Sequence, residues 1–204
     1  FDESIDGQVN VALSPRQPGS SIKPITYVTA LQRGWSTADV LWDVPIELDL
    51  GDGEKMVPTN YEGYYRGPVL FRDALANSYN VPAVLVLQDL GVPHMLEFAR
   101  QMGITTWNQD SSSYGLSLTL GGAEVTPLEL TAAYAVFANG GNQVTPISIL
   151  RVQKSNGEIL FEQPPQAAVS VLDPRVAYLI SNILDDDEAR VPAMGRSNPL
   201  ALPF

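Results

Sequence analysis

The stretch that decides how this sequence is interpreted is Arg16-Gln17-Pro18-Gly19-Ser20-Ser21-Ile22-Lys23-Pro24. Apolar residues then recur about every third position, at Ile22, Ile25, Val28 and Leu31. This spacing predicts a helix over about residues 20–33, which ends before Gly34. Ser20 and Lys23 therefore share one face of that helix. Because Ser20 lies in the first turn, unpaired N–H groups and the positive end of the helix dipole favour a developing alkoxide there.

Lys23 supplies the base that such a serine needs. A lysine desolvated beside the serine has a lowered pKa and can remove the hydroxyl proton without a histidine. The composition agrees, because the chain has one histidine, His94, and no cysteine. Cysteine nucleophiles, thiolate metal sites and multi-histidine metal sites are excluded, and no cofactor or metal is expected. The alternative is an ordinary capped helix that carries a surface lysine.

A second candidate motif is Ser78-Tyr79-Asn80, expected where a helix ends just before Val81-Pro82. Ser78 can relay a proton, and Asn80 can hold a substrate amide or orient Lys23. The alternative is helix C-cap chemistry, in which serine and asparagine are both common.

The rest of the chain is helix-rich with a few hairpins. Further helices are predicted over about residues 70–78, 82–90, 93–102, 126–139 and 174–184, and hairpins over 44–58 and 149–161. Thr126-Pro127-Leu128-Glu129 has the form of a capping box with proline at the first helical position. Residues 105–122 are expected to be loop, order is expected to break at 185–188, and 191–204 to form an extended tail. The class is therefore α+β with a sheet that has few strands.

The two motifs together resemble those of the penicillin-recognising serine enzymes, whose set is S-x-x-K, S-D-N and K-T-G. The chain is similar to the transpeptidase domain of class A penicillin-binding proteins over nearly its whole length. Four further segments carry the resemblance, namely residues 58–61, 66–68, 121–129 and 134–141. Residues 5–10 and 188–192 resemble the penicillin-binding protein 1C type.

The resemblance implies a fold and an activity for residues 1–204. The fold is the helix-rich part of the serine β-lactamase and DD-transpeptidase fold, with its central antiparallel sheet incomplete. It comprises a nucleophile helix (20–33), a helical subdomain (70–140), a hairpin and last helix (149–184) and the extended tail. Ser20 is expected to be acylated by a D-Ala-D-Ala stem peptide of peptidoglycan or by a β-lactam. Lys23 is the expected base, and Ser78 and Asn80 form the second motif.

The parent protein is expected to be membrane-anchored, with an upstream glycosyltransferase domain, on the extracytoplasmic side of the bacterial membrane. Nucleic acid is not an expected partner, because the net charge is −11 and no basic patch is apparent. The alternative function is a non-catalytic β-lactam-sensing or peptide-binding module on the same fold.

The sequence departs from the family at the third motif. No Lys-[Ser/Thr]-Gly triplet occurs, and Lys154-Ser155-Asn156-Gly157 is interpreted as a hairpin tip. We therefore expect the chain to end just before this motif and the 204 residues to be inactive alone. Glu124 and Glu129 lack the Glu-x-x-x-Asn pattern of class A β-lactamases, so they are interpreted as turn and capping residues rather than as hydrolytic bases.

Two other groups are set aside. The acidic run at 185–188 lacks the alternating ligands and glycine turn of a calcium loop, so it is interpreted as solvated. Tyr61, Tyr64 and Tyr65 are interpreted as packing residues, with a role in a substrate groove as the alternative.

Overall fold

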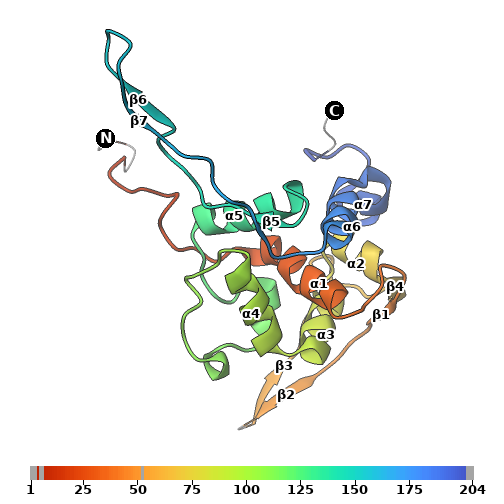
Figure 1. The fold of residues 1–204 in the computed structure, drawn as a ribbon. Helices are drawn as coiled ribbons and strands as arrows, with labels where there is room; N and C mark the ends of the chain where they lie inside the picture. The colour runs from red at the N-terminus through yellow and green to blue at the C-terminus, as the bar shows by residue number, and fades with distance from the viewer. Residues whose placement is uncertain (1–3, 5–6, 52, 201–204) are drawn as a thin grey trace.

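The computed structural model describes residue 4 and residues 7–51 and 53–200 (Figure 1). The α-helices are α1 (Lys23–Gln32), α2 (Phe71–Ala76), α3 (Asn80–Leu90), α4 (Val92–Gln101), α5 (Pro127–Ala138), α6 (Pro174–Asp185) and α7 (Asp187–Met194). Short 3-10 helices accompany them, among them η2 (Gly19–Ile22), η3 (Ser111–Ser113) and η4 (Leu116–Leu120). The helices predicted from the sequence are all present, with ends that differ by at most three residues.

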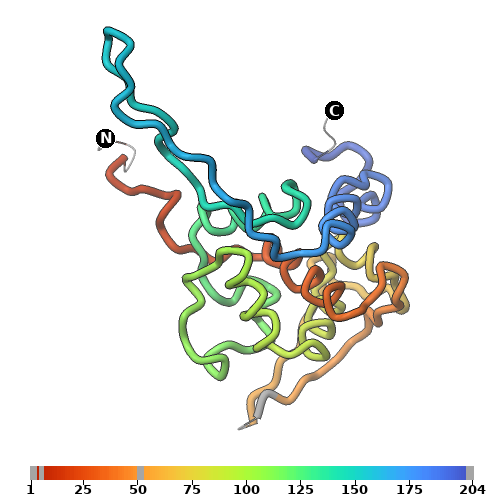
Figure 2. The backbone as a smooth tube through the Cα atoms, in the orientation of Figure 1, coloured from red at the N-terminus to blue at the C-terminus, as the bar shows by residue number. Residues whose placement is uncertain are grey.

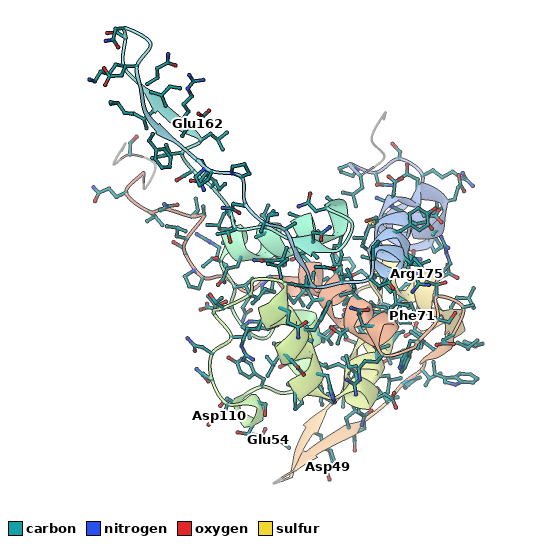
Figure 3. All side chains as sticks on the ribbon, in the orientation of Figure 1. Asp49, Glu54, Phe71, Asp110, Glu162 and Arg175 are labelled. Atoms are coloured by element: carbon teal, nitrogen blue, oxygen red, sulfur yellow. The ribbon has the colours of Figure 1, made fainter. Side chains whose placement is uncertain are left out.

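The strands form four separate antiparallel pairs in the described part of the chain. The pairs are β1 (Val40–Asp43) with β4 (Gly67–Leu70), β2 (Leu48–Gly51) with β3 (Glu54–Met56), β5 (Asn142–Gln143) with β8 (Val169–Ser170), and β6 (Arg151–Gln153) with β7 (Ile159–Glu162). The β6–β7 hairpin projects away from the helices, and Figure 3 labels Glu162 on it. The prediction of an α+β fold with a fragmentary sheet is confirmed.

Helix α1 is the centre of the core. All of its residues from Lys23 to Leu31 are buried, and the tube in Figure 2 shows it running between the other helices. It packs against α3, α4 and α6, and the ring of Tyr27 meets that of Phe71 edge to face at 4.7 Å. Burying each large apolar side chain contributes about 1.5–3 kcal/mol. The position of the Ser20–Lys23 segment is thus fixed by the core itself.

The start of the nucleophile helix differs from the prediction. The α-helix begins at Lys23, and Ser20 lies in the preceding 3-10 turn η2. Pro24 has no N–H, so it cannot donate to the carbonyl of Ser20 as an α-helical residue would. The N–H of Lys23 donates to that carbonyl instead, which is the 3-10 pattern.

The capping box predicted at the start of α5 is confirmed. Thr126 Oγ1 accepts from the N–H of Glu129 at 3.1 Å, and Glu129 Oε2 accepts from the N–H of Thr126 at 3.4 Å. The Glu129 carboxylate also accepts from the backbone and hydroxyl groups of Thr105 and Thr106. Burial alone would raise the pKa of Glu129, but these hydrogen bonds outweigh it and lower the pKa. Glu129 is accordingly a structural residue.

The predicted break of order at 185–188 is wrong, and so is the start of the predicted extended tail over 191–204, of which 201–204 lie outside the described residues. Order does not break at 185–188, because α7 begins at Asp187, and only the part of the predicted extended tail after Met194 lacks regular structure in the described residues. Asp186 caps α7 by accepting from the N–H of Ala189 at 2.9 Å. Asn77 donates to the carbonyl of Ala189 at 2.7 Å and accepts from the N–H of Ala193 at 2.9 Å. These tertiary hydrogen bonds support a helix that contains Pro192.

The region 105–122 is also not purely loop, since η3 and η4 lie in it. In the part of the chain that the structure describes, no helix combines the length and apolar character needed to cross a membrane.

Candidate active site

Three of the four predicted site residues line one cavity of about 760 Å³, namely Ser20, Lys23 and Ser78. The opposite wall comes from Tyr134 on α5 and from α6 and α7. Since α1 is central and α6 packs directly on it, the cavity lies at the N-terminal end of the buried helix. The fourth residue, Asn80, reaches the site through its contact with Lys23.

Lys23 is 1% exposed and has three acceptors around its amine. Nζ donates to the carbonyl oxygen of Ser78, to Ser78 Oγ at 3.1 Å and to Asn80 Oδ1 at 2.6 Å. Burial lowers the pKa of Lys23 from 10.5 to about 7, against the opposing charge of Glu62. A lysine with this pKa is partly neutral near pH 7, as a general base requires.

Ser20 lies exposed at the mouth of the cavity. Between these two fully described residues, no hydrogen bond joins Ser20 Oγ to Lys23 Nζ. The S-x-x-K spacing thus brings both groups to one cavity, but the amine is held by the second motif rather than by the serine.

The second motif lies between two helices, and Ser78 is the left-handed residue just after the C-cap of α2. Its N–H donates to the carbonyl of Leu75 and the N–H of Tyr79 donates to that of Ala74, both at 3.0 Å, which is helix C-cap chemistry. Helix α2 ends at Ala76 with Asn77 as its C-cap, and Asn80 is the first residue of α3. Ser78 has φ +58°, and it is the only non-glycine with positive φ in the described ranges. This left-handed conformation costs a serine about 1–2 kcal/mol, so the surrounding contacts must hold it.

The backbone before Ser20 is held by the segment 121–125. Arg16 and Val125 exchange two backbone hydrogen bonds of 2.9 Å. Gly121, at φ +89°, lies so close that an added Cβ would be 2.3 Å from the nitrogen of Gly19. Tyr134 Oη donates to the carbonyl of Ser21 at 2.7 Å. These contacts hold the turn η2, which contains Ser20, against residues 121–125 and Tyr134.

Of the residues that the sequence set aside, Asp185 and Asp187 of the acidic run line this cavity, whereas the others do not. Lys154 is at the tip of the β6–β7 hairpin, where Nζ bonds Glu158 at 2.9 and 3.0 Å. None of the three tyrosines Tyr61, Tyr64 and Tyr65 lines the cavity. His94 Nδ1 contacts the carbonyl of Leu90 at 2.9 Å. Within the described residues, no group of acidic or histidine side chains is arranged to hold a metal.

Sequence reasoning missed the residues that hold Asn80. Its side-chain N–H donates to the carbonyl of Thr59 at 2.8 Å, which turns Oδ1 toward Lys23. Its backbone N–H donates to Asn60 Oδ1 at 2.8 Å. The segment Pro58-Thr59-Asn60-Tyr61 stood out in the sequence as a resemblance, but nothing in its pattern assigned it a partner.

An exposed serine before a buried helix, a lysine one turn later and a Ser-x-Asn segment beside that lysine match the motifs of the penicillin-recognising serine enzymes. A family model described as penicillin binding protein transpeptidase domain matches residues 7–197, and the chain belongs to this family.

Known relatives agree with this assignment. Penicillin-binding protein 1A of Escherichia coli (strain K12) is 34% identical over 200 residues, which cover 96% of this chain and 23% of the relative. The crystal structure of penicillin-binding protein 1A from Haemophilus influenzae superposes with a TM-score of 0.80 at 29% identity, over 97% of this chain and 32% of that one.

A third comparison shows the fold alone. The penicillin G acyl-enzyme complex of penicillin-binding protein A from Mycobacterium tuberculosis has a TM-score of 0.77 at 23% identity, over 96% of this chain and 47% of that one. The chain spans about a quarter of the length of the curated relatives it matches.

Proposed function

We propose that the whole protein cross-links peptidoglycan as a serine D-Ala-D-Ala transpeptidase, and that β-lactams inhibit it by acylating the same serine. The observation that carries this proposal is the buried Lys23, whose amine meets both residues of the second motif in the cavity that Ser20 lines. The family model and the relatives' names support it.

The proposed reaction has two acyl transfers. Neutral Lys23 accepts the proton of Ser20 Oγ, directly or through the Ser78 hydroxyl, which lies 3.1 Å from its amine. The oxygen of Ser20 attacks the carbonyl of the penultimate D-Ala, the peptide bond breaks, and the terminal D-Ala leaves as an amine that takes up this proton. An acceptor amine then attacks the ester carbonyl, the ester bond to Ser20 breaks as the new amide forms, and the proton lost by the amine passes through Lys23 to Ser20 Oγ. In this geometry Nζ must release one of its present acceptors before it can serve Ser20.

For the whole protein we propose a membrane anchor, an upstream glycosyltransferase domain and an extracytoplasmic location, with stem peptides and β-lactams as partners. Assignment to the penicillin-binding protein 1C type rests on the sequences at 5–10 and 188–192. The family's third motif would add an oxyanion-hole donor, whose loss typically costs about 10²–10³-fold in rate. We therefore propose that these 204 residues alone are acylated far more slowly than the intact protein.

A labelled penicillin tests the function. The intact protein is expected to form a covalent adduct on Ser20, detected by mass spectrometry, and Ser20→Ala is expected to form none. Absence of an adduct on the intact protein would contradict the proposal. A sensor module would form the adduct but would not transfer a stem peptide to an amine, so a transfer assay with an amine acceptor separates the two functions.

The pKa of Lys23 gives the pH dependence of this acylation. Because Lys23 must be neutral to accept a proton and its pKa is about 7, the rate constant is expected to fall as pH drops through 7. The fall should approach about tenfold per pH unit below that point, with a plateau above it. Stopped-flow acylation between pH 5 and 9 measures this. A rate that is constant over that range would show that Lys23 is not the base.

A further inference from the structure

No side chain next to α3 in the sequence caps the N–H groups of its first turn. Its N-cap residue is Tyr79, whose side chain makes no capping hydrogen bond. Asn60 takes over this task, because its Oδ1 accepts from the N–H of Asn80 at 2.8 Å and from that of Val81 at 3.5 Å. A helix N-terminus leaves such donors unpaired unless a side chain reaches them. A residue some twenty positions upstream thus fixes where α3, and with it Asn80, begins.

Asn60 is itself held from behind by a buried carboxylate. Asp43, at the end of β1, is 0% exposed, and Asn60 Nδ2 donates to its Oδ1 at 2.7 Å and to its Oδ2 at 2.9 Å. The N–H of Arg66 also donates to Asp43 Oδ2, at 3.0 Å. Since Nδ2 can only donate, this carboxylate leaves Asn60 Oδ1 as the atom that faces α3. Asp43 therefore sets which way the Asn60 amide points.

The middle residue of the second motif is held by Arg66. The Arg66 guanidinium carbon lies 4.0 Å from the centre of the Tyr79 ring and 4.4 Å from that of Tyr64. Arg66 Nη2 is anchored by Glu62 Oε1 at 3.1 Å. Such a partly desolvated cation–π contact restrains the ring. Two side chains from one loop thus hold both Tyr79 and Asn80.

We propose that Asp43, Asn60 and Arg66 form a clamp of positioning residues that holds Tyr79 and the first turn of α3 and so presents Asn80 Oδ1 to Lys23. None of the three lines the cavity that contains Ser20. They act through the segment 78–80, whose Ser78 carbonyl, Ser78 hydroxyl and Asn80 side-chain oxygen are the three acceptors of the Lys23 amine. The expected effect of the clamp on the rate of acylation rests on the proposed function. Its expected effect on the backbone hydrogen bonds at the start of α3 does not.

The clamp can be tested by exchanging its central pair. In Asn60→Asp two carboxylates face each other in a buried site, so the contact should break. In the double variant Asp43→Asn/Asn60→Asp, one amide again donates to one carboxylate, and position 60 still offers an acceptor to α3. We expect the acylation rate constant to fall about 10²-fold in Asn60→Asp, because a shift of about 1 Å costs that much. The double variant should recover most of it, and the dissociation constant of the non-covalent penicillin complex should change less than about threefold in both.

Hydrogen exchange gives a readout that needs no acylation. The amides of Asn80 and Val81 are expected to exchange at least about tenfold faster in Asn60→Asp and to regain protection in the double variant. The matched control is Leu96→Ala on α4, a buried site away from the cavity. It should lower the melting temperature while leaving the acylation rate constant and the exchange of these two amides unchanged.

The outcomes separate the clamp from the proposed function. An intact protein that takes up no penicillin contradicts the function, and the exchange data then decide the clamp alone. If the wild type is acylated and Asn60→Asp matches it in rate constant and in amide protection, the clamp is refuted. The same holds if Asn60→Asp loses only thermal stability, as Leu96→Ala does.

Discussion

Lys23→Arg is expected to lower the rate constant of acylation by about 10²–10⁴-fold, which is the contribution of a positioned general base. An arginine side chain stays protonated at every workable pH, so it cannot take the proton of Ser20. In the wild-type site the amine is partly neutral near pH 7, because burial lowers the pKa of Lys23 to about 7. A permanent cation in the same 1%-exposed position also has to fit more atoms beside Ser78 and Asn80.

The matched control is Lys55→Arg. Lys55 is exposed and pairs with Glu47 at 2.5 Å on the β2–β3 hairpin, so arginine can replace it without loss of acylation. Mass spectrometry after incubation with a penicillin measures both variants, and circular dichroism confirms that each is folded. Near wild-type acylation by Lys23→Arg would make Lys23 a bystander on a capped helix.

Local signals were enough to predict much of this molecule. The periodicity after Ser20, the Thr126–Glu129 capping box and the Asn-Gly turn of the β6–β7 hairpin each depend on residues close in sequence. Ser20, Lys23 and Ser78 line one cavity, of which the S-x-x-K spacing predicted the first two and the family resemblance added Ser78. Each of these features is determined by residues that lie close together in the sequence or that form a recognisable motif.

What the sequence could not predict depends on contacts between distant segments. Helix α7 was missed because Asn77, more than a hundred residues upstream, bonds both Ala189 and Ala193. Asn80 was expected near a helix C-terminus, but Asn60 makes it the start of α3. The direct Ser20–Lys23 pair expected from the spacing is replaced by a lysine that bonds the second motif. No periodicity in one segment encodes the partner that another segment will supply.

Gly121→Ala is expected to destabilise the fold by about 3 kcal/mol or more and to lower acylation by about 10²-fold. The new Cβ would lie 2.3 Å from the nitrogen and 2.5 Å from the Cα of Gly19, and both are backbone atoms that cannot rotate away. Ordinary contact begins at 3.4 Å, so the turn before Ser20 must move by about 1 Å. The φ of +89° adds the strain of a left-handed conformation, about 1–2 kcal/mol.

Gly140→Ala isolates the strain from the steric clash. Gly140 also has positive φ, +60°, but an added Cβ there meets nothing within 4 Å. It should therefore cost only about 1 kcal/mol and leave acylation unchanged. Urea denaturation gives the free energy of unfolding, and the penicillin assay, run where both variants are folded, gives the rate constant. If Gly121→Ala loses no more stability than Gly140→Ala and acylates at the wild-type rate, the contact between Gly121 and Gly19 does not set the position of the nucleophile. If instead only the Gly121 variant is acylated more slowly, the segment 121–125 helps to hold Ser20 at the mouth of the cavity. It would do so from a distance, since none of its residues lines that cavity.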